Sequence, residues 1–249
     1  MARIGVITFP GTLDDVDALR AVRLAGAEPV SLWHKDADLH AVDAVVVPGG
    51  FSYGDYLRCG AIARFAPVME EVVAAAERGM PVLGICNGFQ ALIKLGLVPY
   101  GDIRPMDDTC PTLTFNTIGR HQSQLVRTSV ASTMSPWLSK CTLSDIHTIA
   151  ISHGEGRFVA SDELLETLKA NGQIATQYVD ATGTPSMDFS VNPNGSVLAI
   201  EGITSPDGRV LGKMGHTERS GAGLYKNIPE LTAGDQFQPL IEGGVEYFK

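Results

Sequence analysis

The sequence predicts an α/β fold: an open, mostly parallel sheet with helices on both faces, in three layers. Short apolar strands alternate with helical segments in the first half of the chain, and crossovers of that length join parallel strands. In the second half the apolar runs are shorter and turn residues are frequent, which predicts additional antiparallel strands. We expect both halves to build one sheet, and residues 1–249 to form a single domain.

The elements of the first half follow one another in a regular order. Asp14 and Asp15 stand where caps of the first helix are expected, and Gly26 stands where that helix ends. A Pro-Gly-Gly turn at 48–50 ends the third strand, and Cys86 follows the fourth. The expected strands are residues 3–9, 28–33, 44–47 and 80–85, and the expected helices begin near residue 14 and cover 61–79 and 87–95.

The second half predicts mainly strands. The segments 192–195 and 206–208 combine Asn, Pro, Asp and Gly, which is typical of turns between strands. The expected strands are residues 123–130, 148–152, 174–179, 198–204 and 210–214, and a short helix is expected over 162–171.

The composition is that of a globular chain with an acidic balance. Of the 249 residues 44% are hydrophobic, and the formal net charge is −9. This charge argues against a nucleic-acid partner and against binding to an anionic membrane. No segment approaches the ~20 consecutive apolar residues of a membrane span. The first residues enter a strand without the apolar region of a secretory signal.

The cysteines point to a reducing compartment. Cys59, Cys86, Cys110 and Cys141 show no paired spacing. Free thiols are typical of the cytosol, so we expect a cytoplasmic protein with unpaired cysteines.

The most specific local pattern is a strand that runs into a cysteine and turns at once into a helix. Apolar residues lead to Cys86, and Asn87 and Gly88 open the helix. This is a nucleophile-elbow pattern with sulfur in place of oxygen, and the helix N-terminus favours the thiolate. A cysteine in an apolar run is often inert core filling, so the pattern alone leaves both interpretations open.

A cysteine nucleophile needs a base and a group that orients this base. His153 and His216 both stand in polar, glycine-flanked settings. We favour His216, because it follows an apolar strand and Glu218 lies two residues further on, where both side chains point the same way in an extended backbone. Cys86, His216 and Glu218 are therefore a candidate triad, although a single histidine is more often structural.

Attack on a carbonyl also needs N–H donors for the oxyanion. We expect them from Asn87, next after the cysteine, and from the Gly49-Gly50 turn at a neighbouring strand end. Other chemistries fit poorly. The chain has no G-x-x-x-x-G-K-[ST] phosphate loop, and no P-C-x-x-C follows His216 as in a zinc deaminase. We expect no metal site.

Several longer segments extend these observations into a family resemblance. They are residues 8–12, 48–60, 84–90, 153–158 and 192–196, together with the pair His216 and Glu218. These segments resemble class I, triad-type glutamine amidotransferases. Within that class they are most similar to the glutaminase subunit or domain of phosphoribosylformylglycinamidine synthase. The resemblance covers about residues 3–219, and the segment 48–60 is much more specific than the cysteine elbow.

The resemblance implies a flavodoxin-like glutamine amidotransferase fold and a role for each site residue. Cys86 would be the nucleophile, His216 the base and then the acid, and Glu218 its orienting partner. Two further pairs match family positions: Gly50 and Asn87 match the oxyanion donors, and Gln90 and Gly154 match positions that contact the substrate glutamine.

The resemblance also implies substrates and a partner. Glutamine would be hydrolysed to glutamate through a cysteinyl thioester, and the ammonia would pass to a synthetase subunit or fused domain. That synthetase would use Mg-ATP to convert formylglycinamide ribonucleotide to its amidine. No cofactor is implied for this chain, which agrees with the missing phosphate loop.

The chain departs from the family where the base lies. The family usually has Pro-His-Pro-Glu-Arg, whereas residues 215–219 are Gly-His-Thr-Glu-Arg, which leaves the backbone around His216 less fixed. The usual Gly-Thr-Asn is Gly-Thr-Leu at 11–13. Three alternatives stay open: a glutaminase that serves another synthetase, a catalytically weakened interaction domain of the same fold, and a stand-alone cysteine hydrolase. The chain resembles a version fused to a long synthetase, so it is either a separate subunit or part of a fusion.

Overall fold

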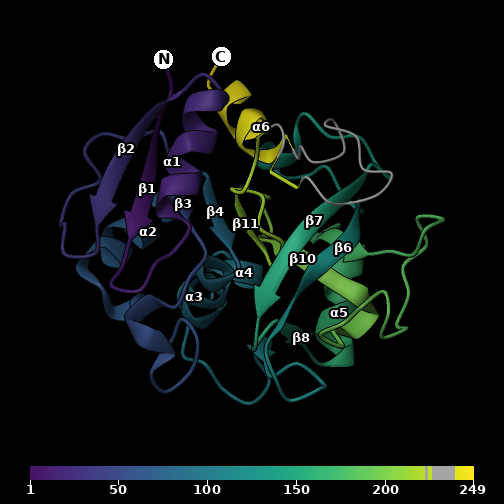
Figure 1. Cartoon of the computed structure of the whole chain (residues 1–249). Coiled ribbons are helices and arrows are strands. Elements are labelled where there is room, and N and C mark those ends of the chain that lie inside the picture. Colours follow the sequence, from purple (N-terminus) through teal and green to yellow (C-terminus); the bar gives the residue numbers. More distant parts are fainter. Residues whose placement is uncertain (222–223, 226–238) are drawn as a thin grey trace.

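The computed structural model describes residues 1–221, 224–225 and 239–249 and places their strands around one large sheet (Figure 1). Within these residues the sheet is nine-stranded, in the order β2-β1-β3-β4-β11-β10-β9-β6-β7. Its strands are β1 (Arg3–Thr8), β2 (Glu28–Trp33), β3 (Ala44–Val47), β4 (Val82–Ile85), β6 (Gln122–Val130), β7 (Ile146–His153), β9 (Ile174–Tyr178), β10 (Ile200–Thr204) and β11 (Val210–Lys213). A separate antiparallel pair joins β5 (Thr112–Thr114) to β8 (Arg157–Val159).

The α/β fold class predicted from the sequence is confirmed. Strands β2, β1, β3, β4 and β11 pair in parallel, and β10, β9, β6 and β7 continue the same sheet in antiparallel fashion. The strands of the second half thus extend the first sheet, as expected. The last strand, β11, inserts between β4 and β10. This insertion puts the chain segments that follow Ile85 and Lys213 side by side.

Helices cover both faces of the sheet. α1 contacts β1, β2 and α6, whereas α3 contacts β3, β4 and β11 on the opposite face together with α2 (Figure 1). The helices are α1 (Asp15–Leu24), α2 (Pro67–Glu77), α3 (Asn87–Leu95), α4 (Leu97–Tyr100), α5 (Asp162–Ala170) and α6 (Leu240–Glu246). Within the described residues, every helix is too short or too polar to span a bilayer.

Two details of the predicted helices are wrong. The second helix starts at Pro67 instead of residue 61, because a separate 3-10 turn over Ala63–Phe65 precedes it and proline suits the first helical position. Asp14 precedes α1 but makes no side-chain cap. Its carboxylate instead contacts His216 and Arg219.

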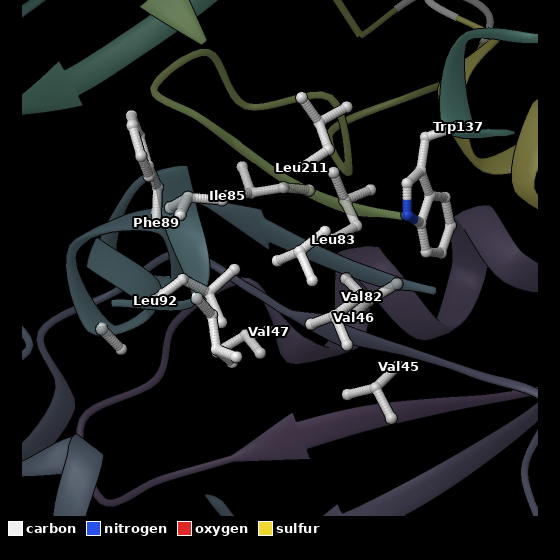
Figure 2. Packing of buried hydrophobic residues seen from close by; sticks show 14 of the residues in the cluster. Val45, Val46, Val47, Val82, Leu83, Ile85, Phe89, Leu92, Trp137 and Leu211 are labelled. Atoms are coloured by element: carbon white, nitrogen blue, oxygen red, sulfur yellow. The ribbon is translucent and has the colours of Figure 1, made fainter. Parts of the chain in front are cut away.

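The core lies between the parallel strands and the helices. Apolar side chains of β3, β4 and β11 alternate between the two faces of the sheet, and the buried cluster that they form includes residues of α3 and Trp137 (Figure 2). The labelled members are all buried: Val45, Val46, Val47, Val82, Leu83, Ile85, Phe89, Leu92, Trp137 and Leu211. α3 lies so close to β3 that a Cβ at Gly88 would clash with the Val47 carbonyl oxygen. This packing fixes the first turn of α3, which directly follows the candidate nucleophile Cys86.

The β6–β7 hairpin returns over the carboxyl ends of the central strands. The His216 N–H donates to the Ala150 carbonyl at 2.9 Å, and the Cys86 sulfur lies 3.6 Å from the Ser152 carbonyl oxygen. Both carbonyls belong to β7. A strand from the edge of the sheet therefore forms one wall of the site.

Candidate active site

Cys86 lies on a tight elbow between β4 and α3. Its backbone adopts φ 51° and ψ −104°, a conformation that is rare for a non-glycine residue and typical of functional turns. Its N–H donates to the Lys213 carbonyl at 2.8 Å, and its own carbonyl accepts from the Gln90 N–H at 3.0 Å. The main chain on both sides of the sulfur is thereby fixed, and the predicted elbow is present.

His216 follows β11, the parallel neighbour of β4. Its Nδ1 lies 3.1 Å from Glu218 Oε1, and both residues are buried. The same Glu218 oxygen also accepts a hydrogen bond from the Gly49 N–H at 3.2 Å. The predicted pair is thus in contact, but the backbone between its members is a turn and not extended, because the Thr217 N–H donates to the Gly215 carbonyl.

Asp14 is a second carboxylate on the same imidazole. Its Oδ2 lies 3.3 Å from His216 Nδ1. Arg219 holds Asp14 in a two-pronged contact, with Nε donating to Oδ1 at 2.9 Å and a terminal nitrogen donating to Oδ2 at 3.1 Å. The sequence reasoning missed this role, because Asp14 stands where a helix cap is expected.

These contacts set the protonation of the base. Burial lowers the pKa of His216, but the negative charge of Cys86 and then that of Glu218, with the contact to Asp14, outweigh it and hold this pKa well above its ordinary value. Burial raises the pKa of Asp14, but the hydrogen bonds to His216 and Arg219 outweigh it and lower this pKa to about 2. The arrangement therefore favours a protonated imidazole at His216, which can act as the acid partner of a cysteine nucleophile.

The second ring nitrogen of His216 is left for chemistry. Nε2 is buried and makes no well-formed hydrogen bond with any described residue. Catalytic hydrogen bonds are often loose without substrate. Cys86 is the first of the groups that raise the pKa of His216.

His153, the other candidate base, has a different environment. Burial and the neighbouring charge of His216 lower the pKa of His153 to about 3. Its Nδ1 lies 3.2 Å from the Asn116 side-chain oxygen. Within the described part of the chain no carboxylate contacts His153. A histidine that is neutral at physiological pH and has no such contact is a poorer partner for a thiolate than His216, so the geometry supports the choice of His216.

The two expected oxyanion donors lie at neighbouring strand ends. β3 and β4 pair with Val47 opposite Gly84, and Gly50 and Asn87 each follow three residues later. The Ser52 N–H donates to the Asn87 side-chain oxygen at 3.0 Å, which ties the two turns together. Asn87 is the first residue of α3, where backbone N–H groups have no partner within the helix. A Cβ at Gly50 would lie 2.6 Å from the Leu13 nitrogen, so only glycine fits this turn.

Gln90 lies in a buried polar network behind the nucleophile. Its side-chain oxygen accepts from Asn87 at 2.9 Å, and its side-chain nitrogen donates to the Glu155 carbonyl at 2.9 Å. Arg58 donates from Nε to both Glu155 carboxylate oxygens, at 3.2 and 3.0 Å. The segments 48–60 and 153–158, which carried the resemblance, therefore meet around Gln90.

Gly154 follows β7 beside Cys86 and faces open space. A Cβ built there would meet no atom of the described residues within 4 Å, while its carbonyl accepts from the Asn116 N–H at 2.9 Å. A backbone that is held on one side and open on the other suits contact with a small substrate. The role of Gly154 in binding stays a prediction.

The segment 192–196 supports the site from behind. The Asn194 side chain donates to the Gly156 carbonyl at 2.9 Å and to the Tyr178 hydroxyl at 2.9 Å. The Ser196 hydroxyl accepts from the Phe158 N–H at 3.0 Å. These buried contacts fix the loop that follows His153, so this segment is structural and not catalytic.

Among the residues that the structure describes, two groups of side chains have ligand atoms close enough to share a metal ion. One is Asp14, His216 and Glu218, and the other is Cys141, Asp145 and His147; within each group these atoms lie within 4.8 Å of one another. Hydrogen bonds from Arg219 and Gly49 already use the carboxylates of the first group. Thr142 donates to both oxygens of Asp145 in the second. That the chain needs no metal stays a prediction.

Known proteins share this arrangement of the chain. A family model described as a CobB/CobQ-like glutamine amidotransferase domain matches residues 1–248. The chain belongs to this glutamine amidotransferase family. The predicted family resemblance and the predicted enzyme class are therefore confirmed.

Two relatives from different organisms carry the same name. This amidotransferase is 54% identical over 220 residues to the phosphoribosylformylglycinamidine synthase subunit PurQ of Mycobacterium tuberculosis, with 88% of each chain covered. It is 49% identical over 237 residues to the subunit of the same name from Corynebacterium jeikeium, which covers 91% of this chain and 96% of that one. The solved structure of PurLQS from Thermotoga maritima matches with a TM-score of 0.75 and 30% identity, over 100% of this chain and 99% of that one.

Proposed function

We propose that this amidotransferase is the glutaminase component of phosphoribosylformylglycinamidine synthase. The observation that carries the proposal is that Cys86 and a histidine held by Glu218 follow the carboxyl ends of two neighbouring parallel strands. Ligands of open α/β sheets bind at such ends. The relatives that are subunits of this synthase supply the pathway.

The proposed reaction has two halves. The Cys86 thiolate attacks the side-chain amide carbon of glutamine, and the oxyanion forms beside the N–H groups of Gly50 and Asn87. The His216 imidazolium gives its proton to the nitrogen, the C–N bond breaks, and ammonia leaves a thioester. Neutral His216 then takes a proton from water, whose oxygen attacks the thioester carbon and releases glutamate and the Cys86 thiolate.

The remaining site residues would bind and orient the substrate. Glu218 would hold the His216 tautomer by accepting from Nδ1. Gln90 and the backbone of Gly154 would contact the amino-acid part of glutamine. Their support is their place beside Cys86: Gln90 on the first turn of α3, and Gly154 directly after the strand whose Ser152 carbonyl faces the sulfur.

The ammonia would be consumed on a synthetase subunit or fused domain. That partner would use Mg-ATP to convert formylglycinamide ribonucleotide to formylglycinamidine ribonucleotide, and this chain would need no cofactor of its own. Exposed apolar side chains beside the site support a docking partner. Tyr56 and Leu57 are 73% and 86% exposed, and they directly precede Arg58, which contacts Glu155.

A cytoplasmic location fits this chemistry. The attacking group must be a free thiolate, and Cys59, Cys86, Cys110 and Cys141 are all unpaired. A reducing compartment keeps such thiols free. We further propose that the chain works as one amidotransferase domain, because the strands of both halves share the sheet that assembles the site.

The test is a comparison of two nitrogen sources. Purified chain with its synthetase, ATP and formylglycinamide ribonucleotide should form the amidine from glutamine or from ammonium. Cys86→Ala should abolish the glutamine-dependent reaction and keep the ammonium-dependent one. Cys110→Ala, the same substitution at a half-buried thiol, should keep both the glutamine-dependent and the ammonium-dependent reaction. Glutamine turnover by Cys86→Ala would overturn the proposed mechanism, and a stoichiometric interaction with a different synthetase alone would overturn the proposed pathway.

A further inference from the structure

Gly215, the residue that precedes His216, is held through its N–H and its carbonyl by a buried ion pair. The Gly215 N–H donates to Glu201 Oε1 at 2.5 Å, and Lys213 Nζ donates to the Gly215 carbonyl at 3.0 Å. Lys213 Nζ also lies 3.1 Å from Glu201 Oε1, and both side chains have 0% exposure. Both hydrogen-bonding groups of Gly215 are therefore bound by charged side chains.

Lys213 and Glu201, which together form a bracket around Gly215, are anchored on neighbouring strands of the sheet. Lys213 ends β11, and Glu201 belongs to β10. The second carboxylate oxygen of Glu201 accepts from the hydroxyl of Thr176 on β9. Strands β9, β10 and β11 are adjacent, so the loop that carries the base is fastened to the rigid centre of the sheet.

Lys213 connects the base loop to the nucleophile as well. Its backbone carbonyl accepts from the Cys86 N–H at 2.8 Å, while its ammonium group holds the Gly215 carbonyl. Lys213 therefore fixes the main chain at the nucleophile, Cys86, and at Gly215, next to the base His216. A rotation of the Gly215–His216 peptide would break the contact to Lys213, and a rotation of the Met214–Gly215 peptide would break the contact to Glu201.

Stability alone does not account for this pair. Removing two charges from water is expensive, and apolar residues of similar volume are often as stabilising as a buried ion pair or more so. The flanking prolines that would stiffen this loop are absent, since residues 215 and 217 are Gly and Thr. A proline at 215 would lack the N–H that Glu201 binds. The bracket therefore supplies the rigidity that the local sequence lacks.

We propose that Lys213 and Glu201 are positioning residues that aim the His216 imidazole at the Cys86 sulfur by clamping Gly215. The inference rests on the proposed function for its catalytic meaning, but the geometry it describes has its own readout. A well-placed base increases the thiolate character of Cys86, so the alkylation rate of Cys86 reports the alignment without any glutamine.

Two double variants separate aim from stability. Lys213→Met with Glu201→Leu removes both charges and the whole bracket. Lys213→Met with Glu201→Gln removes the same charges but keeps an oxygen that can accept from the Gly215 N–H. Neither variant leaves an unpaired buried charge, so we expect both to fold, with thermal midpoints within a few degrees of the original chain. Leu168→Ala, a buried change in α5, lowers the midpoint away from the site and serves as the stability control.

The readouts are iodoacetamide alkylation of Cys86, followed by mass spectrometry, and glutamine turnover in the complex with the synthetase. In Lys213→Met with Glu201→Leu, Cys86 should be alkylated about tenfold to a hundredfold more slowly than in the original chain. The kcat for glutamine should fall by a similar factor, with KM within about twofold. The variant with glutamine should recover most of the alkylation rate, and Leu168→Ala should match the original chain below its melting transition.

Equal alkylation of Cys86 in the original chain and the leucine double variant would overturn the positioning role. Slower alkylation in that variant, together with no glutamine turnover even by the original chain, would leave the positioning role standing and overturn the proposed function instead. Loss of alkylation in Leu168→Ala as well would assign the effect to stability and also overturn the positioning role.

Discussion

The carboxylate of Asp14 lies 3.3 Å from Nδ1 of His216, although the two residues come from opposite ends of the chain. The same nitrogen lies 3.1 Å from Glu218, so two carboxylates share one N–H donor. Arg219 neutralises part of this charge by its two-pronged contact with Asp14. Two carboxylates and one guanidinium leave a net negative charge beside the imidazole, which favours its protonated form.

Replacing this second carboxylate should shift the pH dependence of the enzyme. In Asp14→Asn the pKa of His216 loses one of the contacts that raise it. The alkaline limb of kcat, where the imidazolium is lost, should move to lower pH, and kcat at neutral pH should fall about tenfold. The measurement is the pH profile of glutamine turnover. Asp15→Asn is the matched control, because Asp15 accepts from the Thr8 hydroxyl instead of facing the base. Overlapping profiles for Asp14→Asn and the original chain would contradict the shared contact.

The same variant should change acid stability in a defined direction. The pKa of Asp14 is lowered from 3.8 to about 2 in the folded chain. Its stabilising contribution is therefore complete above the unfolded value and is lost as the pH falls from about 4 through about 2. On this basis Asn should cost on the order of 2 kcal/mol at pH 7 and almost nothing near pH 2. Urea unfolding at both pH values checks this, and an equal cost at both would assign the loss to packing.

The parallel half of the fold could be predicted because its signals are local. Each strand there is a short apolar run with a turn or a helix after it, and such crossovers constrain the topology. Cys86 was found for the same reason, since the strand, the turn and the helix are consecutive in the sequence. Glu218 was found because it lies two residues from His216, although the backbone between them is a turn.

The parts of the site that depend on distant segments were not predicted. Asp14 was assigned to a cap, because its contact with His216 exists only once β11 lies beside β4. The return of β7 over Cys86 depends on how the antiparallel half curves, which no local pattern encodes. Lys213 was visible as a charge at the end of an apolar strand. Its partner, Glu201, lies on another strand and could not be identified from spacing.

Gly154 offers a test of substrate placement. Its Cβ position is empty to 4 Å and its φ is not in the left-handed region, so Gly154→Ala should fold with an unchanged melting temperature. If the amino-acid end of glutamine lies there, the methyl group should raise KM for glutamine about tenfold while kcat in saturating glutamine changes little. Steady-state kinetics with glutamine checks this, with ammonium-dependent synthesis as the internal control. An unchanged KM would remove Gly154 from the binding site.

Gly49 should behave in the opposite way. A Cβ there would lie 2.5 Å from Asp14 Oδ2 and 2.7 Å from His216 Cε1. Both of these groups are buried, so a methyl group must displace the base. Gly49→Ala should therefore lower kcat at least a hundredfold and slow the alkylation of Cys86. Normal alkylation in this variant would show that the imidazole can shift without loss of alignment.

His153 should make the chain sensitive to acid. Its pKa is lowered to about 3 in the folded chain, so between about pH 6.5 and 3 the unfolded chain binds a proton that the folded chain does not. Stability should fall with decreasing pH in this window, by about 1.4 kcal/mol per pH unit for this one group. The pKa of His216 is raised, so its stabilising contribution is complete below the unfolded value and adds no slope there.

The variant His153→Gln should remove this slope. Urea unfolding at pH 7, 6, 5 and 4 gives the free energy of unfolding of both chains. The free energy of the original chain minus that of the variant should decrease as the pH falls, because only the original chain keeps a histidine neutral at this position in the folded state. His34 and His147, whose pKa values burial also lowers, are present in both proteins, so the difference isolates His153. His40→Gln, at an exposed position, controls for the loss of a histidine. Parallel stability curves for His153→Gln and the original chain would mean that His153 takes up a proton in the folded site, which would reopen its candidacy as the base.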